Sequence, residues 1–210
     1  MKETYLTISN SGCDEFVIQK SRFIGYASPC QTEEEAQQFI LDIREKHRDA
    51  KHHCYAYVIG LNSGIMRYSD DGEPAGTAGM PIMDVLKKEG IVNCCVVVVR
   101  YFGGVLLGTG GLVRSYTQGC KIALRAAAII RMEMTSVRRC RVVYSVWNQM
   151  QHILQNSSVV LDNIVYSDAV EFDIIVRNKD CDEVFRMIDN LTGGKVAWLK
   201  TEEKYMPWTV

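Results

Sequence analysis

Residues 96–114 read VVVVRYFGGVLLGTGGLVR, and this stretch decides the fold around it. Four consecutive valines predict a strand that is buried on both faces. A loop with five glycines follows, and the segment from Leu112 onward has the periodicity of a helix. The stretch therefore predicts a buried strand, a glycine-rich loop and the start of a helix.

Such a loop is a candidate anion site. Glycine lets the backbone take positive φ and approach a ligand closely, and a helix N-terminus carries partial positive charge. Arg100 and Arg114 place a permanent charge on each side of the loop. The alternative is that the glycines only let the loop pack tightly against the sheet, and the sequence leaves both interpretations open. The candidate residues here are Tyr101, Gly103, Gly104, Gly108, Gly110 and Gly111.

The loop does not match the two common nucleotide-binding fingerprints. Walker spacing from Gly103 and Gly108 places Thr109 where the lysine is required. Dinucleotide spacing from Gly108 and Gly110 places Val113 where the third glycine is required. The sequence therefore supports neither a P-loop ATPase nor a Rossmann dehydrogenase.

A second cluster, YSDDGEPAGTAGMP, occupies residues 68–81. The carboxylates of Asp70, Asp71 and Glu73 could hold Mg²⁺ together with water or phosphate. Asp-Asp-Gly is also common in turns, where an Asp side chain bonds its own backbone and glycine supplies positive φ. Both interpretations stay open. A helix from about residue 79 to residue 88 is expected next, ended by Gly90.

Four blocks of this sequence resemble the signature blocks of the YigZ/IMPACT family. The resemblance is strong from about residue 20 to residue 128, and the chain beyond is similar to the small C-terminal domain of the bacterial YigZ branch. The blocks are SRFI at 21–24, AKHHCYAY at 50–57, SDDGEPAGTAG at 69–79 and RYFGG at 100–104, followed by the glycines and Leu112.

This resemblance implies an α+β protein with an IMPACT N-terminal-like domain over residues 1–132. The implied fold is shared by a domain of a small-subunit ribosomal protein, domain IV of elongation factor G and the GHMP group of small-molecule kinases. In eukaryotes the family is associated with control of a kinase that shuts down translation initiation. For this chain, the resemblance implies a non-enzymatic, translation-associated protein that binds RNA, the ribosome or a translation factor. The candidate phosphate contacts are Lys20, Arg22, His52, Arg67, Arg100 and Arg114.

The alternative is an enzyme with a phosphate-binding small-ligand site, either a phosphotransferase or a hydrolase, built from the acidic and glycine-rich loops. A Cys/His hydrolase is disfavoured because His53 and Cys54 alternate faces on a predicted strand, and His52 lies one strand repeat away from Cys54. No catalytic residue is assigned, and neither a cofactor nor a metal is expected.

Composition bounds the partners and the compartment. The 210 residues carry a formal net charge of −1, which argues against a large basic surface for nonspecific nucleic-acid binding. The eight cysteines include no C-x-x-C pair, and several lie in apolar strand patterns. We expect free thiols in a reducing cytoplasm and no membrane segment. The oligomeric state is left open.

The remaining elements of the first domain follow from pattern. Thr32 and Glu35 form a capping box before an amphipathic helix. Residues 54–59 and 66–69 predict a hairpin across Asn62-Ser63-Gly64. Further strands are expected at 3–9, 15–19, 23–27 and 94–99, and a helix at 112–128.

A charged, unpatterned stretch at 129–136 is interpreted as the domain boundary, with a second domain over 135–210. Its expected elements are strand 137–146, helix 147–155, strands 159–166 and 169–177, helix 180–191 and strand 195–200. This βαββαβ order predicts a ferredoxin-like domain. Tyr144, Phe172 and Trp198 are either core residues or stacking aromatics for RNA on an open sheet face.

Overall fold

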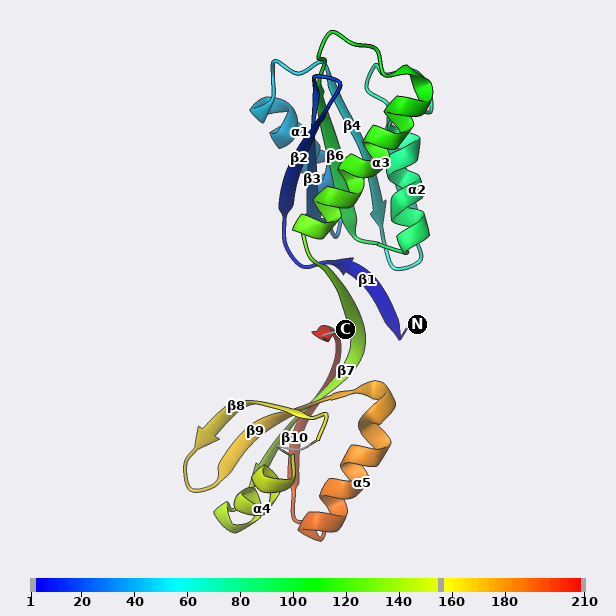
Figure 1. The fold of residues 1–210 in the computed structure, drawn as a ribbon. Coiled ribbons are helices and arrows are strands. Elements are labelled where there is room, and N and C mark those ends of the chain that lie inside the picture. Colours follow the sequence, from blue (N-terminus) through cyan, green and yellow to red (C-terminus); the bar gives the residue numbers. More distant parts are fainter. Residues whose placement is uncertain (1–2, 155–156, 209–210) are drawn as a thin grey trace. The chain divides into compact units, whose positions relative to one another are not determined.

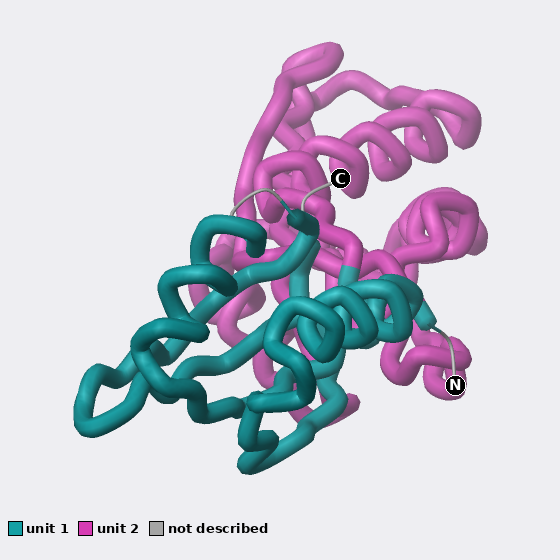
Figure 2. Tube along the Cα trace, turned by 90° about the horizontal axis from the view of Figure 1, so that it is seen from below, with its two compact units in different colours: residues 1, 3, 132–208 teal, residues 2, 4–131, 209–210 magenta. Residues whose placement is uncertain are grey.

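The computed structural model describes residues 3–154 and 157–208. Its contacts divide the chain into two compact units (Figure 2). We call residues 4–131 the N-terminal unit, and residue 3 with residues 132–208 the C-terminal unit. The division falls inside one strand, β7 (Ile129–Val142).

The N-terminal unit is built on an antiparallel sheet with the strand order β2-β3-β6-β4-β5. Its central strand, β6, is the predicted apolar strand, and it pairs with β3 on one side and β4 on the other. The strands are β2 (Gly12–Ile18), β3 (Ser21–Pro29), β4 (His52–Ile59), β5 (Ile65–Ser69) and β6 (Cys94–Tyr101), preceded by β1 (Thr4–Ile8).

Helices cover both faces of this sheet (Figure 1). Helix α1 (Glu33–Lys46) packs on one face, while α2 (Gly79–Glu89) and α3 (Gly108–Ala126) pack on the other. Val96 and Val98 belong to the core under α2 and α3, whereas Val97 and Val99 belong to the core under α1. Because side chains alternate along a strand, β6 can be apolar throughout only when both faces are covered.

The start of α1 and the end of α2 lie at the predicted capping residues. The Thr32 side chain accepts a hydrogen bond from Glu35 N, and α2 ends at Gly90 with φ 66°. The start of α3 differs from expectation, because the helix begins at Gly108 and includes Gly110 and Gly111. Glycine is a poor helix former, so these residues resemble a loop in sequence although packing holds them in a helical turn.

The C-terminal unit has the predicted order of strands and helices. After β7 come α4 (Tyr144–Leu154), β8 (Val160–Tyr166), β9 (Val170–Arg177), a short 3-10 turn (Asn178–Asp180), α5 (Cys181–Thr192) and β10 (Ala197–Trp208). Strand β10 pairs with β7, β7 with β9, and β9 with β8. The last residue predicted for the first helix, Gln155, lies outside the described residues.

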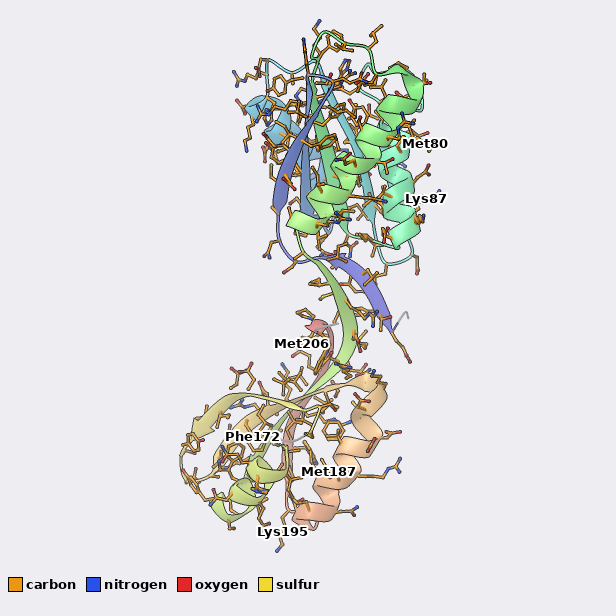
Figure 3. All side chains as sticks on the ribbon, viewed as in Figure 1. Met80, Lys87, Phe172, Met187, Lys195 and Met206 are labelled. Carbon is orange, nitrogen blue, oxygen red and sulfur yellow. The ribbon has the colours of Figure 1, made fainter. Side chains whose placement is uncertain are left out.

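Two expectations for this unit need correction, and for Phe172 the structure decides between two alternatives. The division between the units falls within residues 129–136 as expected, but this stretch is not unpatterned: it is the first part of β7, in which Met132 and Met134 alternate with charged residues. Tyr144 starts α4 rather than lying in a strand. Phe172 is fully buried against α4 and α5 (Figure 3), so it is a core residue and no stacking platform.

Candidate functional site

A row of three side chains crosses the N-terminal sheet under α2 and α3. Arg100 on β6 lies opposite Phe23 on β3 and opposite His52 on β4. The guanidinium of Arg100 also sits over the Phe23 ring, 5.5 Å from its centroid. Arg100 has this position because it follows Val98 at the strand repeat of two, which turns it toward α3.

Arg100 and Glu73 form a buried ion pair. Arg100 Nη1 donates to Glu73 Oε1 at 2.8 Å, and the same oxygen accepts from the Tyr116 hydroxyl at 2.7 Å. Arg100 is 5% exposed and Glu73 is 9% exposed. Ser21 Oγ lies 3.5 Å from Arg100 Nη2 and accepts from Gly103 N at 3.1 Å. Arg100 Nε is buried and makes no hydrogen bond within the described residues.

The ion pair forms one wall of a cavity of about 420 Å³. Lys51 and His52 add basic groups to it, and the first turn of α3 contributes backbone N–H groups that no helical carbonyl can satisfy. The N-cap residue Leu107 supplies no side-chain cap. The lining residues are Lys51, His52, Glu73, Pro74, Arg100, Phe102, Leu106, Leu107, Gly108, Thr109 and Leu112.

The cavity combines positive charge with apolar surface. Phe102 is 53% exposed and Leu106 is 85% exposed at its rim. The Arg100 guanidinium lies 5.4 Å from the centroid of the Phe102 ring. Phosphate is favoured at a helix N-terminus, and an exposed aromatic ring can stack on a base. The cavity volume is in the range typical of small-molecule sites.

The predicted glycines have different roles. A Cβ on Gly103 would lie 2.0 Å from the carbonyl carbon of Lys20, so this glycine permits close backbone packing. Gly104 and Gly108 have φ of 82° and 69° and nothing within 4 Å of a Cβ position. Gly108 lines the cavity, whereas Gly110 and Gly111 continue the first turn of α3. Close packing therefore explains Gly103, whereas Gly108 lies at the cavity and is not needed for packing.

The acidic loop places one of its three carboxylates at the cavity. Asp70 accepts hydrogen bonds from the backbone N–H groups of Gly76, Ala78 and Gly79, at 2.8–3.0 Å, and so holds the start of α2. Asp71 accepts from His53 N and from Arg44 Nη2, each at 2.6 Å. These bonds hold both carboxylates within the protein structure, and neither residue lines the cavity.

Other candidate residues lie away from the cavity. Arg22 and Tyr101 face each other on the α1 side of the sheet, and Arg22 pairs with Glu15. Arg67 is exposed near Glu33, 3.8 Å away. Lys20 is exposed in a turn with φ 65°. The row on β3, β6 and β4 therefore brings His52 and Arg100 together, whereas Arg22 and Tyr101 face the opposite side of the sheet.

Arg114 also lies outside this cavity. Its Nη1 is 3.7 Å from the position that a Cβ on Gly110 would take, and it lines a separate groove along the outer face of α3. The expectation that Arg100 and Arg114 flank one common site is not met by the geometry, since they line different hollows.

On the α1 side, His47 connects two tyrosines. Tyr26 OH lies 2.7 Å from His47 Nε2, His47 Nδ1 lies 2.9 Å from Tyr101 OH, and Tyr101 OH donates to Asp49 at 2.8 Å. Since Tyr101 uses its proton on Asp49, we assign the Nδ1–H tautomer to His47, with Tyr26 donating to Nε2. Burial, with a contribution from Lys46, lowers the pKa of His47 below its usual value.

The thiols show no sign of nucleophilic activation. Cys54 lies on the same face as His52, but its sulfur donates to Asp70 O at 2.9 Å, and burial raises the pKa of the thiol well above its usual range. All eight cysteines are free, as expected, and Cys54, Cys94, Cys95 and Cys120 are buried. Within residues 3–154 and 157–208, no group of three His, Cys, Asp or Glu side chains is arranged to hold a metal ion.

Several residues of the cavity escape sequence reasoning. Lys51 and Phe102 lie inside or beside the family blocks, but neither belongs to a pattern that marks it as a cavity residue. Tyr116 is buried in the core of the N-terminal unit, and only the tertiary structure shows that its hydroxyl donates to Glu73. None of the helices in the described chain is long and apolar enough to cross a membrane.

Comparison with known proteins gives consistent matches. The family model described as the Impact N-terminal domain matches residues 19–124. The chain is 40% identical over 206 residues to the IMPACT family member YvyE of Bacillus subtilis, covering 98% of this chain and 95% of that protein. It is 49% identical over 110 residues to the IMPACT family member YigZ of Escherichia coli, covering 51% and 54%.

A eukaryotic relative and a solved structure extend this result. The chain is 33% identical over 94 residues to the Protein IMPACT homolog of Dictyostelium discoideum, which covers 43% of this chain and 27% of that protein. A crystal structure described as that of an hypothetical protein matches with a TM-score of 0.60 and 32% identity, covering 97% of this chain and all of the other.

Proposed function

Because this chain belongs to the IMPACT family, as its signature blocks predicted, we propose that it is a non-enzymatic, translation-associated protein that binds single-stranded RNA. The proposed site is the cavity beside Arg100 at the N-terminus of α3. A phosphate would lie near Lys51, His52 and the first turn of α3, and its base would stack on Phe102. The proposed place of action is the cytoplasm, on RNA or the ribosome.

The observation that carries this proposal is the composition of the cavity wall. Basic groups, free helical N–H groups and an exposed aromatic ring converge on one hollow. These are the chemical groups that bind a nucleotide through its phosphate and its base face. The strand order β10-β7-β9-β8 in the C-terminal unit supports the ferredoxin-like arrangement, which is also found in RNA-binding domains.

The state of the ionisable groups favours binding over catalysis. The Asp70 and Asp71 carboxylates are held by backbone N–H groups and Arg44, and Glu73 is paired with Arg100. A general base needs a lone pair within reach of substrate, and a metal-assisted reaction needs free carboxylate oxygens. The contacts of these three carboxylates therefore favour a binding role over a catalytic one.

RNA binding can be measured by fluorescence anisotropy with a labelled single-stranded oligonucleotide at 50 and 200 mM salt. Phe102→Ala should weaken binding about 5- to 150-fold, the range for loss of one stacked base. Lys51→Gln should weaken it and reduce the salt slope by about 0.7. Leu41→Ala, an exposed apolar residue on α1, and Lys179→Gln, an exposed lysine in the C-terminal unit, are the matched controls.

Two outcomes would count against the proposal. Wild-type protein that fails to bind the oligonucleotide at 50 mM salt would exclude RNA as the partner of this site. Equal losses in the cavity variants and the controls would exclude the cavity. The volume of about 420 Å³ also fits a free phosphorylated small molecule. In that second candidate function, nucleoside monophosphates would bind with the same dependence on Phe102 while the oligonucleotide would not bind.

A further inference from the structure

The outer face of α3 carries a row of basic residues. Residues 108–126 include no Asp or Glu, and Arg114, Lys121 and Arg125 are exposed. At 100° per residue these three positions lie within about 40° of one another around the helix axis, and they span about 16 Å along it. We call Arg114, Lys121 and Arg125 the basic row.

The basic row is unpaired, unlike most arginines of this protein. Among residues 3–154 and 157–208, eight other arginines form ion pairs with Asp or Glu: Arg22, Arg44, Arg48, Arg67, Arg100, Arg139, Arg141 and Arg177. In the part of the chain that the structure describes, no member of the row has an ion pair. The protein has enough carboxylates to neutralise itself, with a net charge of −1, so the row is left unpaired by its placement.

The row borders a groove of about 410 Å³ whose lining includes Val113 and Ile122. Cationic heads therefore surround a partly apolar floor. At one end, the Arg114 guanidinium lies near Gly110 in the first turn of α3. Positive charge is unfavourable at a helix N-terminus, and a bound anion would reverse that cost.

We propose that the basic row is a track for the phosphate backbone of single-stranded RNA, continuing from the cavity at the N-terminus of α3. This inference rests on the proposed RNA-binding function and adds a second surface to it. A line of cations over 16 Å matches a polymer with regularly spaced phosphates, and the apolar floor suits sugars and base faces. Guanidinium groups at both ends can each hold two phosphate oxygens.

The test compares two charge reversals of equal size in the full-length protein. Lys121→Glu with Arg125→Glu changes the row, and Lys179→Glu with Lys195→Glu changes exposed lysines of the C-terminal unit (Figure 3 labels Lys195). Affinity for labelled oligo(U) is measured from 50 to 200 mM salt, with Phe102→Ala in parallel. Far-ultraviolet circular dichroism establishes that each variant is folded, and Lys121→Gln with Arg125→Gln repeats the test without introducing new charge.

The row variant should bind oligo(U) at least ten-fold more weakly at 50 mM salt, with a salt slope smaller by about 1.4. The control pair should change affinity less than three-fold. Equal losses in both pairs, or unchanged binding in the row variants while Phe102→Ala still weakens it, would overturn the track and leave the cavity proposal intact. Equally tight binding of poly-L-glutamate would overturn it in favour of an acidic protein. A wild-type protein that does not bind oligo(U) would overturn both.

Discussion

Glu73 Oε1 lies 2.8 Å from Arg100 Nη1, and both side chains are more than nine-tenths buried. The two residues come from positions 27 apart in sequence, one in the loop before α2 and one at the end of β6. Because removal of one partner leaves the other charge buried and uncompensated, the pair links the shape of the cavity to the stability of the N-terminal unit.

Replacing Glu73 alone should therefore be costly. We expect Glu73→Leu to destabilise the N-terminal unit by about 3–5 kcal/mol, and Glu73→Leu with Arg100→Met to cost less than that. Urea unfolding followed by far-ultraviolet circular dichroism measures the loss. All three tryptophans, Trp147, Trp198 and Trp208, lie in the C-terminal unit, so a tryptophan-fluorescence transition provides an internal control. A double variant less stable than the single one would contradict this account.

Asp70 should affect folding more than binding. Its carboxylate accepts three backbone hydrogen bonds around the start of α2, so Asp70→Ala leaves those donors without a partner. We expect a loss of about 2 kcal/mol or more in the free energy of unfolding, and a smaller loss for Asp70→Asn, which keeps one acceptor oxygen. RNA affinity of the folded fraction should stay within three-fold of wild type. A large loss of affinity with unchanged stability would instead assign Asp70 to the ligand.

His47 should make stability depend on pH in a defined direction. Its folded-state pKa is lowered, mainly by burial, so the unfolded chain binds a proton more readily than the folded one. The neutral imidazole therefore contributes stability above the unfolded pKa of about 6.5, and this contribution is lost as pH falls through the folded pKa. The His47→Gln variant should destabilise the protein more at pH 7.5 than at pH 5. Urea titrations at both pH values measure this, and an equal effect at both would contradict it.

Two glycines in the same segment should respond oppositely to alanine. Gly103→Ala places a methyl group 2.0 Å from Lys20 C, where backbone must move, and we expect a loss of more than 2 kcal/mol. Gly110 lies in the helix with only the Arg114 side chain nearby, at 3.7 Å, so Gly110→Ala should stabilise α3 by up to about 1 kcal/mol. Thermal melts of both variants give the comparison. Stabilisation by both substitutions would contradict this prediction, because it would show that the backbone at Lys20 can move at little cost.

Strand and helix patterns predicted much of the fold. The four valines predicted that β6 is buried on both faces, and strand alternation correctly predicted that His53 and Cys54 point to opposite faces of the sheet. The starts of α3 and β7 were missed for different reasons. The first turn of α3 was not predicted because Gly108 and Gly110 have low helix propensity. The start of β7 was not predicted because the charged residues Arg131 and Glu133, which alternate with methionines, suggested a loop.

The candidate site was predicted in part. Arg100 and His52 share one face because their strands pair in register, which sequence blocks alone do not reveal. The three carboxylates of the acidic loop look equivalent in sequence, but their partners differ. Asp70 accepts hydrogen bonds from backbone N–H groups, Asp71 accepts one from Arg44, and of the three only Glu73 lines the cavity. Such partners depend on the tertiary structure, and no local pattern encodes them.

The strand order β2-β3-β6-β4-β5 has a consequence for synthesis on the ribosome. The hairpins β2–β3 and β4–β5 can form from local sequence, but each exposes an unpaired edge until β6 inserts between β3 and β4. The sheet of the nascent chain therefore cannot close before residue 101 has left the exit tunnel. During that interval, two open edges are available for aggregation or chaperone binding, and closure is slow because it joins distant segments.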